Sequence, residues 1–200
     1  GFILELGRNS LFLSLVLTMV TCLVLGMGIP TIPNYIITSS IAAPALLELG
    51  VPLLVSHMFV FYFGILADLT PPVALACFAA APIAGERGLK ISLWAVRIAV
   101  AGFVVPFIAV YSPVLMLQGG GALAVAYTLF KTILAIGLWG MASIGCLRES
   151  LTWWERLLAF AAGAALIMAL PITDELGFAL AVLVIGLHRR RVRQDKAVGT

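Results

Sequence analysis

The chain has 200 residues and a formal net charge of +3, and 62% of its residues are hydrophobic against 10% charged. Its mean hydropathy is +1.15. A soluble domain of this size cannot bury so much apolar surface, so the composition excludes a soluble protein and indicates an integral membrane protein. The positive charge lies largely between His188 and Lys196 and reports membrane orientation, so no nucleic-acid partner is expected.

The chain begins at Gly1, and apolar sequence follows at once without a basic segment or a small-residue cleavage site. We therefore expect a portion of a longer chain rather than a cleaved signal peptide. Cys22, Cys77 and Cys146 lie far apart in apolar segments, and no CxxC spacing occurs. They are predicted to be buried small side chains rather than metal ligands, and no cofactor is expected.

The first apolar stretch, Leu11 to Leu47, is interrupted by glycines and prolines between Gly26 and Pro33. Prolines break helices, and irregular backbone is tolerated at membrane depth only where it is buried in protein or lines a watery site. We expect two half-helices that enter and leave by the same face, forming a re-entrant hairpin over residues 11–49. The tip of this hairpin would then lie at the membrane midplane.

The second stretch, Leu53 to Ala84, contains polar and helix-breaking residues at its centre. These residues are Asp68, Thr70, Pro71 and Pro72. The stretch is long for one plain helix and short for two spans, because one crossing takes about 20 residues. We predict a single crossing over residues 53–84, made of two half-helices. Because intramembrane carboxylates are rare, Asp68 is expected to contact an ion or solute; the alternative is a carboxyl hydrogen-bonded to a helix end.

The following segment, residues 89–117, begins with an amphipathic pattern up to Ile98. That pattern predicts a helix along the inner membrane interface, followed by a span. Residues 118–188 are expected to form about three transmembrane helices, and residues 189–200 a basic cytoplasmic tail. The three apolar runs are Ala122 to Gly145, Leu157 to Pro171, and Leu176 to Leu187.

Lysines and arginines fall on alternate connections between these segments, and Ile172 to Glu175 is among the connections without them. The positive-inside rule therefore places the C-terminal tail in the cytoplasm and makes the chain multi-pass. Lys131 is an exception, because it lies in the middle of a predicted span. It could pair with a carboxylate such as Asp68 or extend to an interface.

Two helix breaks that face each other at the midplane are the sequence pattern of a transporter binding site. Prolines free upstream carbonyls, and these oxygens together with the hydroxyls of Thr31 and Thr70 suit a small cation such as Na+. The half-helix N-termini beyond each break suit an anionic substrate. The candidate cation and solute ligands are Gly26, Gly28, Pro30, Thr31, Asn34, Asp68, Thr70, Pro71 and Pro72.

Several sequence runs look like the large permease subunit of TRAP transporters, in the fused form that works with TAXI-type solute-binding proteins. The runs are Leu25 to Thr31, Ala43 to Leu46, Leu49 to Val51, Phe59 to Gly64, and Leu69 to Ala76. The similarity spans roughly Leu11 to Leu117, and the later helices resemble the C-terminal extension of that subfamily.

The resemblance implies an elevator-type permease of the bacterial or archaeal inner membrane, driven by a sodium or proton gradient. It also implies an anionic organic solute, delivered by a periplasmic binding protein of the TAXI type. Many members carry an acidic residue followed by Ser or Thr at the second hairpin tip, where this chain has Pro30-Thr31 and so keeps only the hydroxyl. Such permeases contain two inverted repeats, so this chain reads as the C-terminal half, with the N-terminal half and membrane lipid as its other partners.

A channel-like protein and an intramembrane enzyme of unknown substrate are the alternatives. An enzyme would need a nucleophile and a base, and the spans contain neither HExxH, GxSxG nor a paired-aspartate motif. A channel would conduct without a binding protein or ion coupling. A purely structural scaffold would not explain why both breaks fall at membrane depth.

Overall fold

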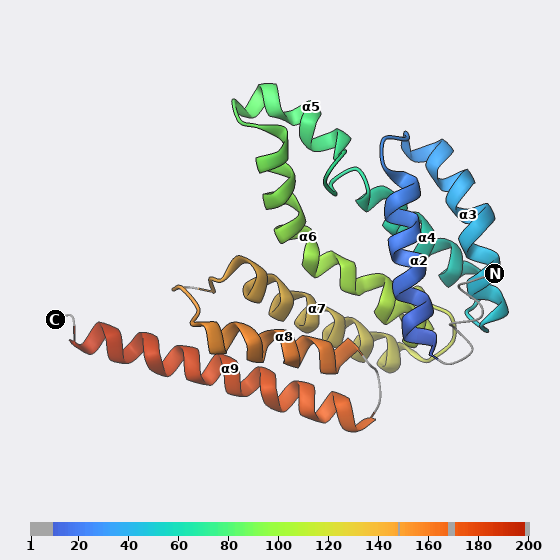
Figure 1. Ribbon diagram of the computed structural model, residues 1–200. Coiled ribbons are helices and arrows are strands. Elements are labelled where there is room, and N and C mark those ends of the chain that lie inside the picture. The colour runs from blue at the N-terminus through green and yellow to red at the C-terminus, as the bar shows by residue number, and fades with distance from the viewer. Residues whose placement is uncertain (1–9, 148, 168–170, 199–200) are drawn as a thin grey trace. The chain divides into compact units, whose positions relative to one another are not determined.

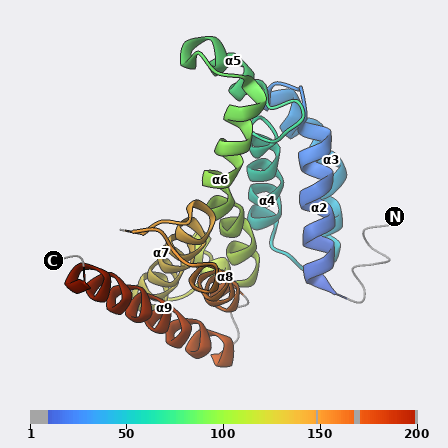
Figure 2. The same cartoon turned by 60° about the vertical axis from the view of Figure 1, so that its left-hand side comes forward.

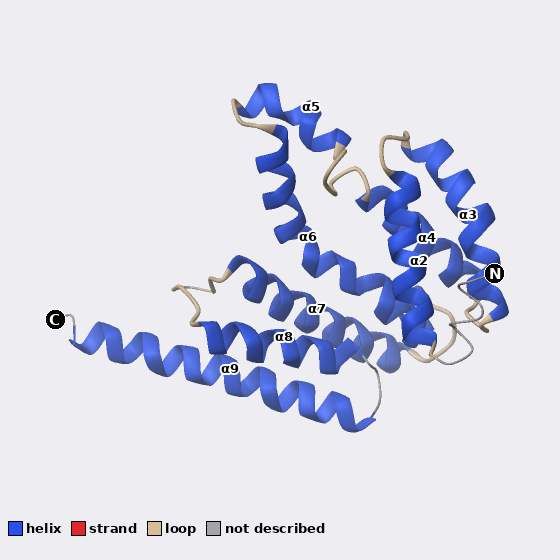
Figure 3. Cartoon of the chain, in the orientation of Figure 1, coloured by secondary structure: helices blue, strands red, loops and turns tan. Residues whose placement is uncertain are grey.

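The computed structural model describes residues 10–147, 149–167 and 171–198, and its regular elements in these ranges are helices (Figure 1). Figure 3 shows the loops that connect them. The chain divides into two compact units, Gly1–Val96 and Arg97–Thr200. The expected all-α fold, with a helical hairpin and a broken helix, is therefore confirmed.

Unit 1 contains the hairpin and the broken helix. The hairpin consists of α2 (Leu11–Gly26) and α3 (Thr31–Glu48), which pack against each other and against α4 (Leu53–Leu66) (Figure 2). The Ser10 side chain accepts a hydrogen bond from the Leu13 amide and thereby caps the start of α2. After the break the chain continues as α5 (Leu75–Ala84).

The core of unit 1 is formed by α4 and the faces of α2 and α3 that contact it. Phe59 and Phe63 of α4 are almost fully buried and meet edge to face, with ring centroids 4.8 Å apart. Leu15 from α2 and Leu46 from α3 are fully buried as well. Because lipid is as apolar as these side chains, close van der Waals packing rather than the hydrophobic effect holds such helices together.

Helix α6 (Gly88–Tyr111) is one continuous helix, and it is followed by the short 3-10 helix η1 (Pro113–Met116). The segment expected along the interface up to Ile98 is therefore joined to the following span in one helix, and its position at the interface stays a prediction. Nothing between residues 89 and 105 interrupts the backbone ladder, so extending the existing helix adds one hydrogen bond per residue, whereas a second helix would need its own nucleus. Among the described residues, α6 and α7 (Ala122–Ile144) are long and apolar enough to cross a membrane.

Unit 2 contains three long helices after α6. Helix α8 (Trp153–Ile167) packs against both α7 and α9 (Pro171–Val198). Residues 172–175, expected as a loop, form the first turn of α9, because a proline is well suited to the first helical position. The basic residues from Arg189 onward continue α9 rather than forming a separate tail. Cys22 and Cys77 are buried as expected, but Cys146 is exposed because α7 ends just before it.

Candidate functional site where the hairpin tip meets the helix break

The hairpin tip is built by glycine and proline backbone geometry. Helix α2 ends at Gly26, and Gly28 has φ +77°, a left-handed conformation that side-chain-bearing residues rarely adopt. Pro30, with φ −56°, then caps α3, and its carbonyl accepts from the Asn34 amide at 3.0 Å. Pro30 and Thr31 are exposed at the start of α3. The tip therefore presents a helix N-terminus and a threonine hydroxyl.

The break between α4 and α5 is a compact series of turns. The Ala74 amide donates to the Thr70 carbonyl at 3.2 Å, and the Ala76 amide donates to the Asp68 carbonyl at 3.2 Å. Ala74 has φ +40°, which is unusual for a residue with a side chain. The Pro71–Pro72 peptide bond is cis, and Pro72 is exposed. The chain thus restarts as α5 without a long loop.

The tip and the break are in contact. The Asn34 side-chain amide donates to the Gly64 carbonyl at 2.8 Å, and Asn34 is 1% exposed. A Cβ atom on Gly26 would lie 2.6 Å from Asn34 Nδ2 and 2.8 Å from Ala67 Cβ. A Cβ atom on Gly28 would lie 3.4 Å from Val73 Cγ1. The structure therefore packs Gly26, Gly28 and Asn34 of the tip against Gly64, Ala67 and Val73 around the break, and only glycine fits at position 26 without displacing its neighbours.

Asp68 and Thr70 lie within the break and differ in how their oxygens are used. Thr70 Oγ1 donates to the Leu66 carbonyl at 2.8 Å, which leaves its lone pairs as acceptors. Asp68 Oδ1 is buried and accepts no hydrogen bond from the described protein atoms. The sequence left two alternatives for Asp68, contact with an ion or solute and a hydrogen bond to a helix end. Oδ1 does not form the hydrogen bond of the second alternative. A buried carboxylate oxygen without a hydrogen-bond partner is unusual and has the chemistry to accept a proton or to coordinate a cation.

The carbonyls that Pro71 and Pro72 were expected to free are already used within the protein, because the Ala67 carbonyl accepts from the Thr70 amide at 3.1 Å and the Asp68 carbonyl accepts from the Ala76 amide. The Leu69 carbonyl accepts from Ser92 Oγ at 2.8 Å, and Cys77 Sγ lies 4.0 Å from it. The buried Ser92 thereby ties the first turns of α6 to the break. Sequence reasoning missed this contact, because a single serine in an apolar helix carries no signal of the carbonyl that it will meet.

The helix termini give the site its electrostatic character. Helices α3 and α5 both begin here, and neither has an acidic residue in its first turn. The positive end of the helix dipole favours a negatively charged group at such a terminus, although at α5 the Ala76 and Cys77 amides already donate to the Asp68 and Ala74 carbonyls. Asp68 supplies negative charge on the same break, and the combination suits a cation bound near an anion.

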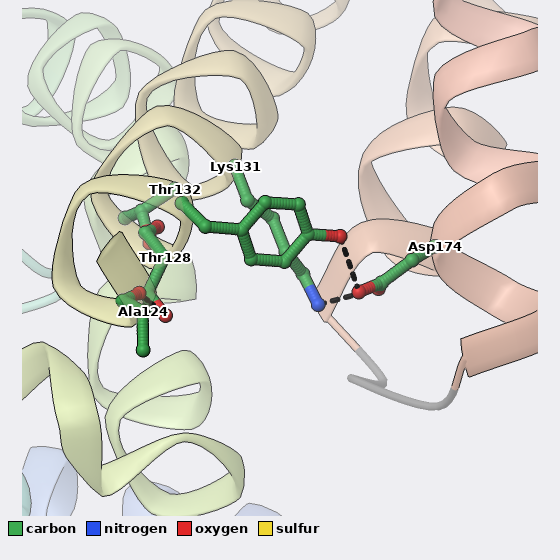
Figure 4. Close-up of polar contacts among 6 residues, drawn as sticks. Ala124, Thr128, Lys131, Thr132 and Asp174 are labelled. Carbon is green, nitrogen blue, oxygen red and sulfur yellow. Dashed lines mark hydrogen bonds and ion pairs between the residues drawn. The ribbon is translucent and has the colours of Figure 1, made fainter. Parts of the chain in front are cut away.

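A second polar cluster lies in unit 2 and joins α7 to α9. Lys131 Nζ is 2.5 Å from Asp174 Oδ1, and the Tyr127 hydroxyl donates to Asp174 Oδ2 at 3.0 Å (Figure 4). The two charged side chains are 4% and 16% exposed. Lys131 therefore pairs with a carboxylate, as one of the two alternatives expected, but the partner is Asp174 rather than Asp68. Asp174 could have been recognised as a candidate partner from the sequence. Pro171 marks the start of a helix, and Asp174 lies in its first turn rather than in the expected loop.

A third cluster stabilises the start of α8. Glu155 Oε2 accepts from the Thr152 amide at 2.7 Å, and Thr152 Oγ1 accepts from the Glu155 amide at 3.4 Å. This reciprocal pair is a capping box, which the Thr-x-x-Glu spacing could have revealed. The same carboxylate oxygen lies 3.2 Å from the Arg191 guanidinium and 3.6 Å from His188 Nδ1. These contacts attach α9 to α8 and are structural.

Comparison with known proteins adds the family. Residues 1–120 match the family described as "Tripartite ATP-independent periplasmic transporter, DctM component". No curated protein and no solved structure matches the chain. The matched region includes the whole hairpin and the whole broken helix. The chain therefore belongs to the DctM family, the membrane permease component of tripartite ATP-independent periplasmic transporters.

Proposed function

We propose that the chain helps to import an anionic organic solute across the inner membrane of a bacterium or archaeon, in symport with Na+ or a proton. A periplasmic binding protein of the TAXI type would deliver the solute, and a small membrane subunit, fused or separate, would complete the transporter. Membership of the DctM family supports the transport role. The solute class, the coupling ion and the binding protein rest on the site and on the resemblance described above.

The observation that carries this proposal is the contact between the hairpin tip and the helix break. Asn34 and Gly26 pack against the end of α4, so the exposed N-terminus of α3 is held beside the turns that contain Asp68. Backbone that is broken at membrane depth is tolerated where it lines a protein-buried or watery site. Two helix interruptions that lie side by side are typical of a transporter binding site, whereas a purely structural scaffold would not need them.

In the proposed mechanism, the coupling ion binds to oxygen atoms at the break. Asp68 Oδ1 supplies charge, and the hydroxyl oxygens of Thr70 and Thr31 are candidate neutral ligands. If the coupling ion is a proton, the Asp68 carboxylate accepts it instead. Either event neutralises the carboxylate, which lowers the repulsion felt by an anionic solute at the N-termini of α3 and α5.

We further propose that an inverted second repeat of the permease contributes a facing tip and break, so that the solute is held between two such pairs. The arrangement in unit 1 would then be one side of the site. The complete permease is therefore the protein on which the site is best tested.

The test is gradient-driven uptake by the complete permease in proteoliposomes with its loaded binding protein. We expect Asp68→Asn and Thr70→Ala each to reduce uptake by tenfold or more, the equivalent of losing about 1.4 kcal/mol of ligand binding. Suitable controls are Glu86→Gln, an exposed carboxylate, and Thr21→Ala, whose hydroxyl donates to the Leu17 carbonyl at 2.8 Å as Thr70 does to Leu66. Unchanged uptake and ion dependence in both site variants would refute the proposed ion site.

The proposed orientation places the end of α9 in the cytoplasm. Gln194 is exposed near that end, so a cysteine at this position can report its side of the membrane. In a background with the exposed Cys146 replaced by serine, we expect Gln194→Cys to resist an impermeant thiol reagent in intact cells and to react after permeabilisation. Rapid labelling in intact cells would reverse the topology.

A further inference from the structure

A cavity of about 700 Å³ lies between α7 and α9, outside the proposed transport site. Side chains of α7 from Phe130 to Met141 form one wall, and residues of α9 from Ile185 to Arg193 form the other. We refer to this cavity as the α7–α9 groove. Its walls are mostly apolar, and Phe130 and Ile133 are 61% and 68% exposed. An apolar ligand can therefore reach it from the surrounding membrane.

The charged groups of the groove are concentrated on α9. Arg189 and Arg193 line it, and their i, i+4 spacing places both on the same face of α9. No aspartate or glutamate is among the lining residues, and no ion pair reaches either arginine from the described side chains. Arg191, in contrast, is paired with Glu155. The groove thus has two arginines available for an external anion.

The two ends of the groove differ, because α7 and α9 run in the same direction along it. The Lys131–Asp174 ion pair links the helices near their starts, and Leu138, Met141 and His188 line the groove further along. The arginines therefore lie toward the helix ends that the proposed topology places at the cytoplasmic surface. An apolar channel that ends in paired arginines at a membrane surface matches a lipid with an acyl chain and an anionic headgroup.

We propose that the α7–α9 groove binds an anionic phospholipid from the cytoplasmic leaflet. One acyl chain lies against Phe130, Ile133 and Leu138, and the phosphate is held by Arg189 and Arg193. The volume falls within the range typical of small-molecule sites. Guanidinium groups bind phosphate oxygens through charge-assisted, often bidentate hydrogen bonds. This inference rests on the proposed membrane topology, but it does not depend on the solute or the coupling ion.

The first test measures lipid binding by the complete permease in zwitterionic detergent, using native mass spectrometry and added phosphatidylglycerol or phosphatidylcholine. We expect phosphatidylglycerol to bind more tightly than phosphatidylcholine. The double variant Arg189→Gln/Arg193→Gln should weaken phosphatidylglycerol binding about thirtyfold, since each basic group near an anionic lipid surface contributes about fivefold. The matched control Arg87→Gln/Arg190→Gln removes the same charge outside the groove and should change binding by less than about threefold.

The second test fills the groove without changing its charge. Gly137 lines the groove, and a Cβ atom at this position would meet open space, so Gly137→Leu should occupy the acyl-chain path. Gly186→Leu is the control, because Gly186 is equally open but does not line the groove. We expect phosphatidylglycerol binding to fall about tenfold in the first variant and to persist in the second. Thermal unfolding of both variants establishes that they are folded.

A third measurement needs no variant. Phosphatidylglycerol with a photoreactive acyl chain should cross-link to peptides that contain residues 130–141 or 185–193. Equal binding of both lipids, full binding by the arginine and leucine variants, or cross-links confined to other helices would each overturn the proposal. A variant that loses the lipid but keeps gradient-driven uptake supports this inference alone. A permease that binds the lipid in the groove but takes up no solute refutes only the transport proposal.

Discussion

Units 1 and 2 differ in how their buried charged groups are used. In unit 1, α3 and α4 are joined by the Asn34 amide on the Gly64 carbonyl and by the Tyr35 hydroxyl beside His57 Nδ1, and the Asp68 carboxylate keeps one oxygen without a hydrogen bond from the described protein atoms. In unit 2 the side-chain links to α9 include ion pairs, Lys131 with Asp174 and Arg191 with Glu155, whereas α7 and α8 share a neutral hydrogen bond from Trp139 Nε1 to the Phe160 carbonyl. A site that binds and releases ligands needs polar atoms that are not already hydrogen-bonded within the protein. A helix bundle with a purely structural role is stable only if its buried charges are paired.

The largest effect is expected from breaking the pair that joins α7 to α9. Lys131→Met leaves the Asp174 carboxylate without its cation, and removing one partner of a buried pair costs about 3 kcal/mol or more. We expect this loss in the free energy of unfolding, measured by denaturant titration of the complete permease in detergent. Lys90→Met is the matched control, because the Lys90–Glu86 pair is exposed and its loss should change stability far less.

The double variant Lys131→Met/Asp174→Leu sharpens this prediction. It removes both charges, so it should recover most of the stability lost by Lys131→Met alone. If Lys131→Met is as stable as the parent chain, the Lys131–Asp174 pair does not stabilise unit 2. The proposed difference between the buried charges of the two units would then be wrong.

A smaller loss of stability is expected at the hairpin tip. Gly26→Ala inserts a methyl group 2.6 Å from Asn34 Nδ2 and 2.8 Å from Ala67 Cβ, so the contact between tip and break must shift. Overpacking of this kind costs about 1–3 kcal/mol, and uptake should fall by more than the stability change explains. Gly137→Ala, at an open helical position, should be neutral or stabilising by up to about 1 kcal/mol. Equal uptake by both variants would show that the packing of the hairpin tip is not needed for transport.

The smallest effect is expected at the exposed Glu86–Lys90 pair at the start of α6. The hydrogen bond from Lys90, and next its positive charge, lower the pKa of Glu86 from its ordinary value of 4.5. A carboxyl group with a lowered folded-state pKa stabilises the protein above the ordinary value and loses this contribution as pH falls through the lowered one. Stability should therefore decrease slightly below about pH 4.5, less so at high salt.

The control for this pH dependence is Glu86→Gln, which cannot titrate. Its unfolding temperature, compared with that of the parent chain between about pH 6 and pH 3, should lack this small component of the slope. An identical slope in both proteins would show that the pair contributes nothing, as is common for exposed ion pairs.

The sequence predicted those features that follow from local chemistry. Glycine and proline between Gly26 and Pro33 end one helix and start another wherever the chain folds, so the α2–α3 hairpin could be located in advance. The same reasoning located the break between α4 and α5 around Asp68. The sequence did not predict that α9 continues to Val198, because a run of arginines is compatible with either a helix or an extended tail.

Only the tertiary structure decided which groups meet. No local pattern indicates that Asn34 donates to Gly64, that Ser92 donates to Leu69, or that Lys131 pairs with Asp174. These partners are 30, 23 and 43 residues apart, and each contact depends on how whole helices pack. The sequence by itself therefore determined a membrane protein with two broken segments, because composition, glycine and proline act locally. The partners of its buried polar groups were decided by helix packing, because a buried donor or charge binds whichever acceptor the neighbouring helix brings to it.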